Sequence, residues 1–281
     1  MCRVLGVSRG GYYRWVKRQE QPPSNREMAN IELTAAIQPT YTKSRGTYGA
    51  PRIHAELKST DLVCSLNRVA RLMRKHALQA RRRRMFKVTT TNSRHSYPLA
   101  PNTLNRQFWA AGPNEKWVTD ITYVPTKEGW LYLAAVLDIY SRKVVGWSMD
   151  KHMEQELVSS ALQMATAHRR PGEGVLHHSD RGSQYAANDY QQLLNAHKMV
   201  VSMSRKGDCY DNAVMESFWS TLKAECATTV YASRSEARRS IFEYIEVWYN
   251  RQRRHSALGY SSPEAYEQRY FESTTVSSKS G

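Results

Sequence analysis

The stretch GDCYDNAVMESFWSTLKAE, residues 207–225, predicts an amphipathic helix that carries one carboxylate, Glu216, on its polar face. The apolar seam of this helix recurs every fourth residue, at Val214, Phe218 and Leu222. Its polar face holds Asn212, Glu216, Ser220 and Lys223. We expect Asp208 to cap the helix, with Asp211 in the capping-box position, which would place Glu216 two turns inside. Taken alone, Glu216 would be an ordinary surface residue, because surface charges are usually solvated.

Two aspartates lie where a carboxylate is unusual. Asp120 interrupts KWVTDITYV, residues 116–124, a β-branched and aromatic run that predicts a strand. A half-buried carboxylate is costly there unless it is paired or bound to a metal. Asp180 follows the apolar stretch VLHHS, so we place it at the carboxyl end of a strand, where catalytic groups are common. Two oxygen donors on strands and a third on a helix could hold one or two Mg²⁺ ions.

Three motifs occur in an order that resembles a known family. They are WVTDITY at residues 117–123, HSDRGSQY at residues 178–185 and DNAVMESFWSTLKAE at residues 211–225. Asp180 and Glu216 are separated by 35 residues, and Lys223 follows Glu216 by seven. The sequence resembles the DDE transposases of bacterial insertion sequences, in particular the second-frame product (OrfB) of the third insertion-sequence family. The catalytic domain of that family is related to retroviral integrases.

The resemblance implies an α/β fold of the ribonuclease-H-like, integrase type, preceded by a small all-α helix-turn-helix module. It implies metal-dependent DNA cleavage and strand transfer, in which Asp120, Asp180 and Glu216 are both catalytic and metal-binding. Two Mg²⁺ or Mn²⁺ ions would serve each active site. Lys223 and Asn212 would hold the DNA. The implied partners are duplex DNA (terminal inverted repeats and target), further copies of the chain on DNA, and a fused upstream-frame product.

Three other functions fit parts of the sequence. A nuclease of the same fold would hydrolyse DNA without joining it. A DNA-binding regulator derived from a transposase should have lost a carboxylate, whereas all three are present here. A structural nucleoid protein would leave the neutral C-terminal half of the chain unexplained.

The positive charge is confined to the N-terminal part of the chain. Of the formal charge of +16, residues 1–112 supply the whole excess, with 21 Lys and Arg against 5 Asp and Glu. The remaining residues hold 20 of each kind. A basic module joined to a neutral one fits a DNA-holding segment attached to an enzyme. A basic surface kept only for solubility is the alternative, but it would not need this much charge.

We predict five segments along the chain. Residues 1–28 resemble the end of a helix-turn-helix followed by a linker, as expected of a downstream frame alone. Residues 29–85 form a helix-turn-helix-like DNA-binding module, and residues 86–112 form an extended connector along DNA or toward a second protomer. Residues 113–270 form the catalytic domain, and residues 271–281 a disordered tail.

The DNA-binding module is predicted from GTYGAPRIHAELKS and SLNRVARLMRKHAL, two helices joined by a short turn at Asp61. Asp tolerates the left-handed turn in which the family commonly has Gly. The inward stripe of the second helix is Val69, Leu72, Met73 and His76. Its outward residues, expected to contact DNA, are Arg68, Arg71 and Arg74 or Lys75, and we expect Arg68 and Arg71 to discriminate sequences. Four arginines that would bind phosphate without reading sequence follow as Arg81, Arg82, Arg83 and Arg84.

The catalytic domain is predicted as three consecutive strands followed by alternating helices and strands. The strands are expected at residues 116–124, 130–138, 143–149, 174–178 and 199–203, and the helices at residues 154–167, 185–197 and 233–252. The stretch YNRQRRHSALGYSSPEAYE, residues 249–267, matches the closing motif of the family. We expect Arg251 and Arg254 of this stretch to touch the DNA backbone; capping of the preceding helix is an equal alternative.

Other polar residues are interpreted as structural. His177 and His178 are adjacent on a strand and point to opposite faces, and Mg²⁺ prefers oxygen ligands. The four cysteines form no C-x-x-C pair, which predicts reduced thiols without a zinc site or disulfides. No apolar run approaches the roughly 18 residues of a membrane span. We therefore expect a cytoplasmic, nucleoid-associated protein with no membrane partner.

Overall fold

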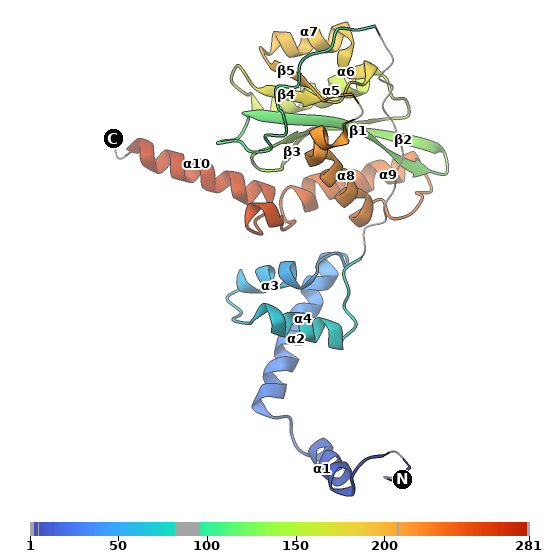
Figure 1. Cartoon of the computed structure of the whole chain (residues 1–281), viewed down its shortest axis with the longest axis vertical. Coiled ribbons are helices and arrows are strands. Elements are labelled where there is room, and N and C mark those ends of the chain that lie inside the picture. The colour runs from blue at the N-terminus through green and yellow to red at the C-terminus, as the bar shows by residue number, and fades with distance from the viewer. Residues whose placement is uncertain (1–2, 5, 82–95, 207, 280–281) are drawn as a thin grey trace. The chain divides into compact units, whose positions relative to one another are not determined.

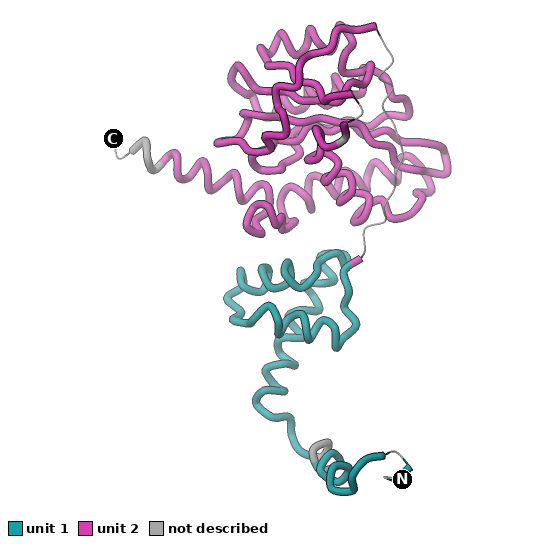
Figure 2. Tube along the Cα trace, in the orientation of Figure 1, with its two compact units in different colours: residues 1–80 teal, residues 81–281 magenta. Residues whose placement is uncertain are grey.

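The computed structural model describes residues 3–4, 6–81, 96–206 and 208–279 of the 281-residue chain. The chain divides into two compact units, residues 1–80 and residues 81–281 (Figure 2). The described part of the first unit is helical, and the second unit is built on a five-stranded sheet (Figure 1).

The helices of the first unit are α1 (Arg9–Glu20), α2 (Asn25–Lys43), α3 (Ala50–Lys58) and α4 (Leu66–Lys75). The last three pack against one another around an apolar core of Leu33, Ile37, Ile53, Leu57, Val69, Leu72 and Met73. Ser65 caps α4, because its hydroxyl oxygen accepts a hydrogen bond from the Arg68 amide at 3.3 Å. Asp61 has a φ of 60°, the left-handed turn expected between the two helices. Helices α3 and α4 are therefore the helix-turn-helix pair that the sequence predicts.

The first unit differs from the sequence analysis at two places. Residues 25–28, expected in a linker, begin α2. Ser24 and Glu27 form a reciprocal capping box, in which the Ser24 amide donates to Glu27 Oε2 at 2.9 Å and the Glu27 amide donates to Ser24 Oγ at 3.3 Å. His76, expected in the core, is the exposed C-cap of α4, because the helix ends one residue earlier.

The sheet of the second unit has the order β3-β2-β1-β4-β5. Its strands are β1 (Lys116–Thr126), β2 (Gly129–Asp138), β3 (Val144–Asp150), β4 (Leu176–Ser179) and β5 (Val200–Met203). Strand β2 is antiparallel to both β1 and β3, whereas β4 is parallel to both β1 and β5. The strands in chain order thus form an antiparallel meander first and parallel additions second, which confirms the predicted α/β fold.

Helices cover both faces of this sheet (Figure 1). On one face lie α5 (Gln155–Arg169), α6 (Ser183–Ala186) and α7 (Asn188–Ala196), over a core that includes Trp117 and Ile121 of β1. Gly146 lets α5 approach closely, because a Cβ atom there would lie 2.2 Å from the Ala161 carbonyl oxygen. The 3₁₀ helix η1 (Cys209–Asn212) leads into α8 (Ala213–Glu225), which packs on β1, and α9 (Arg234–Phe242) packs on β1 and β2.

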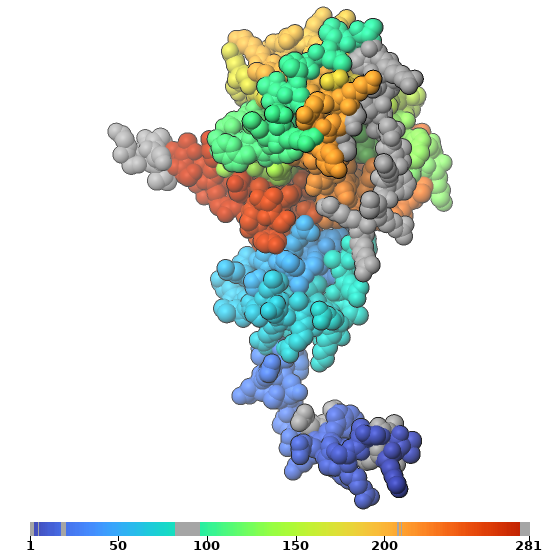
Figure 3. All heavy atoms as spheres, viewed as in Figure 1, coloured from blue at the N-terminus to red at the C-terminus, as the bar shows by residue number. Residues whose placement is uncertain are grey.

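The C-terminal region stays helical beyond the expected limits. The helix predicted over residues 233–252 consists of α9 followed by a π-helix, η2 (Glu243–Tyr249). After η3 (Ser256–Leu258), α10 (Pro263–Lys279) includes residues 271–279, which the sequence analysis expected to be disordered. The Thr274 and Thr275 hydroxyls donate to carbonyls one turn earlier, at 2.9 and 2.8 Å, so they continue the helical pattern. In the space-filling view α10, in red, extends away from the sheet of its unit (Figure 3).

Two general expectations concern thiols and membranes. Among the described residues, Cys64 and Cys226 are not joined in a disulfide. In the described residues, every helix is too short or too polar to cross a membrane.

Candidate active site

Asp120 and Asp180 are neighbours on adjacent parallel strands. Strands β1 and β4 pair with Trp117 opposite His177 and Val118 opposite His178. Continuing this register by two residues brings Asp180, the first residue after β4, beside Asp120. Adjacent strands lie about 4.8 Å apart, and positions two residues farther along face the same side of the sheet. The backbone therefore holds the two carboxylates next to each other.

Asp120 receives a hydrogen bond that the sequence analysis missed. Trp219 Nε1 donates to Asp120 Oδ2 at 3.0 Å, and the Ile121 amide donates to Asp120 Oδ1 at 2.8 Å. Trp219 lies three residues after Glu216 on α8, a spacing that puts both side chains on neighbouring positions of the helix. That spacing was the signal that could have identified it. The indole fixes the Asp120 carboxylate relative to the helix that carries Glu216.

Asp180 is held by the turn that follows β4. Its Oδ1 accepts a hydrogen bond from the Gly182 amide at 2.8 Å. A Cβ atom at position 182 would lie 3.0 Å from the same oxygen, so a larger residue would crowd the carboxylate. Glycine at this position therefore keeps the backbone amide within reach of Asp180.

Glu216 lies in the first turn of α8 and not two turns inside, as the sequence analysis expected. The Asp208 carboxylate caps η1 instead, accepting a hydrogen bond from the Tyr210 amide at 3.1 Å. Helix α8 starts afresh at Ala213 without a side-chain cap. The first turn suits a carboxylate, because the helix N-terminus is electropositive. The Glu216 side chain is exposed there.

The three carboxylates influence one another electrostatically. Burial raises the pKa of Asp120 to about 8, and the charges of Asp180 and, more weakly, Glu216 add to this rise. Hydrogen bonds from Ile121 and Trp219 oppose the shift without cancelling it. The register of β1 and β4 brings Asp120 and Asp180 together, and Glu216 on α8 lies near enough to add a weaker electrostatic effect.

This set of donors fits a hard divalent cation. Mg²⁺ and Mn²⁺ prefer carboxylate oxygens, and a cation would offset the burial, and then the repulsion from Asp180, that raise the pKa of Asp120. Within the described residues, no three His, Cys, Asp or Glu side chains are yet close enough to enclose a metal. Glu216 is exposed, so packing does not fix its side chain away from the aspartates. Asp120, Asp180 and Glu216 are the residues that would hold the cations.

Asn212, expected to contact DNA, is buried and braces the site instead. Its Nδ2 donates to the Thr119 carbonyl at 3.2 Å, which ties the start of α8 to the residue before Asp120. Its Oδ1 is buried without a hydrogen-bond partner in the described part of the chain. Asn212 is only 6% exposed to solvent, so it is not available to contact the DNA backbone.

Lys223 remains a candidate DNA contact. Its Nζ lies 4.9 Å from the centre of the Tyr123 ring, a cation–π distance. Burial lowers the pKa of Lys223, and the nearby Asp120 carboxylate raises it again. A half-buried cation therefore stands on the side of α8 that faces the carboxylates.

The loop before α8 is fixed by Asp211, a fully buried carboxylate. The amide and Nε of Arg205 both donate to Asp211 Oδ2 at 2.9 Å, and Arg106 Nε donates to Oδ1 at 3.0 Å. Hydrogen bonds from Arg205, and then Arg106, hold the pKa of Asp211 well below its usual range. Asn102 Nδ2 also donates to Oδ2, at 2.8 Å. The described part of the predicted connector, which contains Asn102 and Arg106, is therefore bound to the active-site loop.

The C-terminal arginines have three different environments. Arg253 is buried and forms a bidentate pair with Glu225, so it neither touches DNA nor caps a helix. Arg251 is exposed, and its Nε lies 3.6 Å from Glu264. Arg254 donates to the Tyr260 carbonyl at 3.2 Å. Arg251 and Arg254 stay predictions as DNA contacts.

His177 and His178 are structural, as interpreted from the sequence. The Tyr190 hydroxyl lies 3.1 Å from His177 Nε2, and the Ser202 hydroxyl lies 2.9 Å from His178 Nδ1. Burial lowers the pKa of His177 to about 3 and that of His178 to about 4. Both imidazoles are neutral core groups at neutral pH.

The arginines predicted to bind DNA in the first unit lie on or after α4. Arg68 is half-buried, and Arg71 and Arg74 are exposed. Arg81 is exposed as well, whereas Arg82, Arg83 and Arg84 lie outside the described residues.

The chain is similar to proteins of insertion sequences. Residues 110–209 and residues 197–263 match the family described as Integrase core domain, and residues 29–86 match HTH-like domain. Over 271 residues the chain is 47% identical to the Insertion element IS600 uncharacterized 31 kDa protein of Shigella sonnei, covering 96% of this chain and 98% of that protein. It is 44% identical over 268 residues to Transposase InsF for insertion sequence IS3A of Escherichia coli (strain K12), covering 95% and 92%.

Among solved structures, the HTLV-2 integrase catalytic core domain in complex with magnesium is similar with a TM-score of 0.42 and 14% identity. The match covers 56% of this chain and 99% of that one. The assignment itself rests on the sequence relatives, whose similarity extends over nearly the whole chain, and on the integrase core and HTH-like matches. The chain belongs to the IS3 family of insertion-sequence transposases, which are enzymes of the integrase type.

Proposed function

We propose that this transposase cleaves DNA strands at the ends of its insertion sequence and joins them to target DNA in a reaction that depends on Mg²⁺ or Mn²⁺. The observation that supports this most is the register of β1 and β4, which sets Asp120 beside Asp180 and within electrostatic range of Glu216 on α8. Asp180 and Glu216 lie close enough to Asp120 to raise its pKa, and they are acidic residues that a structural core would not gather. A cation bound at this site would neutralise the like charges of the carboxylates.

The proposed chemistry is two successive phosphoryl transfers. In the first, a water oxygen bonds to the phosphorus at the element's end, and the bond to the 3′ oxygen breaks, which leaves a 3′ hydroxyl. In the second, that hydroxyl oxygen bonds to a target phosphorus and displaces another 3′ oxygen. When bound, two metal ions would activate the attacking oxygen and stabilise the leaving one.

The residues of this chain have separate roles in the proposal. Asp120 and Asp180 would hold one ion, and Glu216 would help to hold the second. Trp219 orients the Asp120 carboxylate through its 3.0 Å hydrogen bond. Lys223 is on the same helix as Glu216 and near the charge of Asp120. It would contact a DNA phosphate near the reacting bond.

The wider assembly follows from the charge distribution and the family. Residues 29–85 would bind duplex DNA at the terminal inverted repeats, and residues 113–270 would catalyse the reactions on the element's ends and on target DNA. Residues 86–112 would connect these two parts. Several copies of the chain would assemble on DNA in the nucleoid. Fusion to an upstream-frame product would supply further recognition of the ends.

The test is Mg²⁺-dependent cleavage and joining of oligonucleotides that carry the element's own ends. Asp120→Asn, Asp180→Asn and Glu216→Gln should each lower cleavage by several orders of magnitude, because each removes a charged ligand with little change in size. Near-normal cleavage by any of them would remove that residue from the site. Mg²⁺ should also raise the melting temperature of the wild type more than that of these variants.

Two alternatives make different predictions in the same assay. A nuclease of this fold would cleave but would not join pre-nicked ends to target DNA. A regulator derived from a transposase would bind the ends without cleaving them. Joined products from pre-nicked ends would exclude both.

A further inference from the structure

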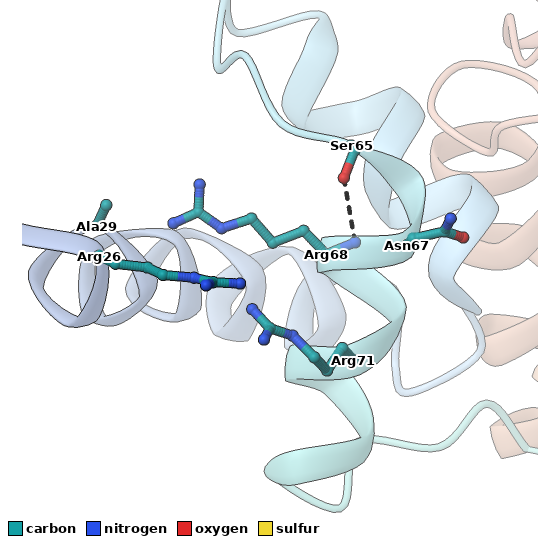
Figure 4. Close-up of a pocket in the computed structure, with 6 residues that line it drawn as sticks. All are labelled: Arg26, Ala29, Ser65, Asn67, Arg68 and Arg71. Atoms are coloured by element: carbon teal, nitrogen blue, oxygen red, sulfur yellow. Dashed lines mark hydrogen bonds between the residues drawn. The ribbon is translucent and has the colours of Figure 1, made fainter.

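Three arginines from two helices line one pocket in the first unit (Figure 4). The pocket has a volume of about 440 Å³. It is lined by Arg26 and Ala29 of α2 and by Ser65, Asn67, Arg68 and Arg71 at the start of α4. Figure 4 shows the arginine side chains reaching into the space between the two helices. The described residues that line the pocket include no acidic side chain, so the charges they bring are all positive.

The charge of this pocket is not neutralised within the described part of the chain, where Arg26, Arg68 and Arg71 form no ion pair with a carboxylate. The hydrogen bond to Arg68 comes from a neutral group instead, because its Nε donates to Asn30 Oδ1 at 2.9 Å. This bond orients the guanidinium and leaves its two terminal nitrogens for a ligand. Three positive charges that face the same space repel one another. An anion placed between them would attract all three and offset this repulsion.

The remaining groups of the pocket also favour an anion. Ser65 Oγ accepts a hydrogen bond from the Arg68 amide at 3.3 Å, so its own hydrogen can be donated to a ligand. The Asn67 amide points away from the three arginines, so Ser65 is the neutral donor on their side (Figure 4). The pocket lies at the N-terminus of α4, a ten-residue helix whose dipole favours negative charge at that end.

We propose that this pocket binds one backbone phosphate of duplex DNA, with Arg26 of α2 as a contact that supplements Arg68 and Arg71 of α4. The proposal rests on the proposed function, because DNA is the anion. An arginine fork matches the oxygens of a phosphate, and a duplex presents one such charge about every 1.7 Å along its axis. Arg68 and Arg71 would then position the DNA, whereas the sequence analysis expected them to discriminate sequences.

The test is binding of the full chain to a labelled random-sequence duplex, followed by fluorescence anisotropy between about 50 and 200 mM salt. Each phosphate neutralised contributes about 0.9 to the slope of log affinity against log salt. Arg26→Ala and Arg71→Ala should each weaken binding roughly tenfold. The double variant should lower the slope by no more than about 0.9, because the slope counts phosphates and not arginines. A fall of about 1.8 would mean two separate phosphates and would overturn the shared pocket.

The matched control is Lys58→Ala, which removes an exposed cation of α3 outside the pocket. It should bind DNA more tightly than Arg26→Ala, and melting temperatures of all variants should agree with the wild type. The preference of Arg26→Ala and Arg71→Ala for the element's ends over random duplex should be unchanged. A lost preference would assign these arginines to base reading and refute the proposal.

Two further outcomes separate this proposal from the proposed function. Wild-type affinity for Arg26→Ala, in a chain that still cleaves DNA with Mg²⁺, would overturn the pocket alone. A chain that binds DNA through these arginines but never cleaves it would support the pocket and overturn the catalysis. Binding of polyglutamate through Arg26 and Arg71, with DNA binding unaffected by their loss, would assign the pocket to an acidic protein and refute the proposal.

Discussion

The buried ion pair between Glu225 and Arg253 should make the stability of the second unit sensitive to the loss of either charge alone. Glu225 ends α8, and Arg253 follows the π-helix η2. Arg253 Nε donates to Glu225 Oε2 at 2.8 Å, and Nη2 donates to Oε1 at 2.7 Å. The side chains are only 3% and 7% exposed, and the Tyr244 hydroxyl adds a hydrogen bond to Oε2 at 3.0 Å.

Arg253→Met should destabilise the fold by about 3–5 kcal/mol, because it leaves the Glu225 carboxylate buried without a counter-charge. Replacing both residues, as Glu225→Leu with Arg253→Met, removes both charges and is often nearly neutral for a buried pair. The Tyr244 hydroxyl then loses its acceptor, which costs about 1–3 kcal/mol. The double variant should therefore be more stable than Arg253→Met by about 2 kcal/mol.

The assay is urea unfolding of the full chain, followed by far-ultraviolet circular dichroism. Arg251→Met is the control, because Arg251 is 64% exposed and its contact with Glu264 is 3.6 Å long. Exposed pairs contribute little, so the control should unfold like the wild type. The reasoning fails if Arg253→Met is no less stable than the control. It fails equally if the double variant loses as much stability as the sum of the losses in Arg253→Met and Glu225→Leu.

Three further predictions concern the site and its DNA. Trp219→Phe removes the hydrogen bond to Asp120 and should lower cleavage roughly tenfold with the fold intact; equal activity at every Mg²⁺ concentration would contradict this role. Hydrogen bonds from Arg205 lower the pKa of Asp211, so the wild type gains stability above the unfolded value of about 4 and loses it as pH falls. Asp211→Asn should therefore melt lower at neutral pH, with the difference shrinking below about pH 4; a constant difference would contradict the linkage. Alanine at residues 81–84 should shallow the salt slope by up to about four units for every sequence; a loss confined to the element's ends would argue against phosphate contacts.

The backbone positions of the site could be predicted because their signals are local. The β-branched run around Asp120 predicts a strand, and the seam of Val214, Phe218 and Leu222 predicts the buried face of α8, which the structure confirms. The capping box of Ser24 and Glu27 is an equally local signal that was overlooked. His76 was misplaced because helical periodicity was continued past the end of α4.

The side-chain partners could not be predicted, because they join distant parts of the chain. Arg106 and Asp211 are 105 residues apart, and their hydrogen bond turns an expected extended connector into a support of the active-site loop. Asn212 is a polar residue of the kind that often contacts DNA. Its neighbour Asp211 pairs with Arg205, and the side chain of Asn212 itself donates a hydrogen bond to the Thr119 carbonyl. Only the tertiary fold decides that such a polar residue is buried.

Helix α8 is held to the rest of the second unit along its whole length, and this has a consequence for the chemistry. Asn212 holds its start to β1, Trp219 holds its middle to Asp120, and Glu225 holds its end to Arg253. The backbone of Glu216 is thus fixed while its side chain stays exposed. Burial, and then the charge of Asp180, raise the pKa of Asp120, so a bound cation would stabilise the ionised form of this carboxylate. Because α8 is held at three points, the position from which Glu216 can reach such a cation is set by the fold rather than by the flexible side chain alone.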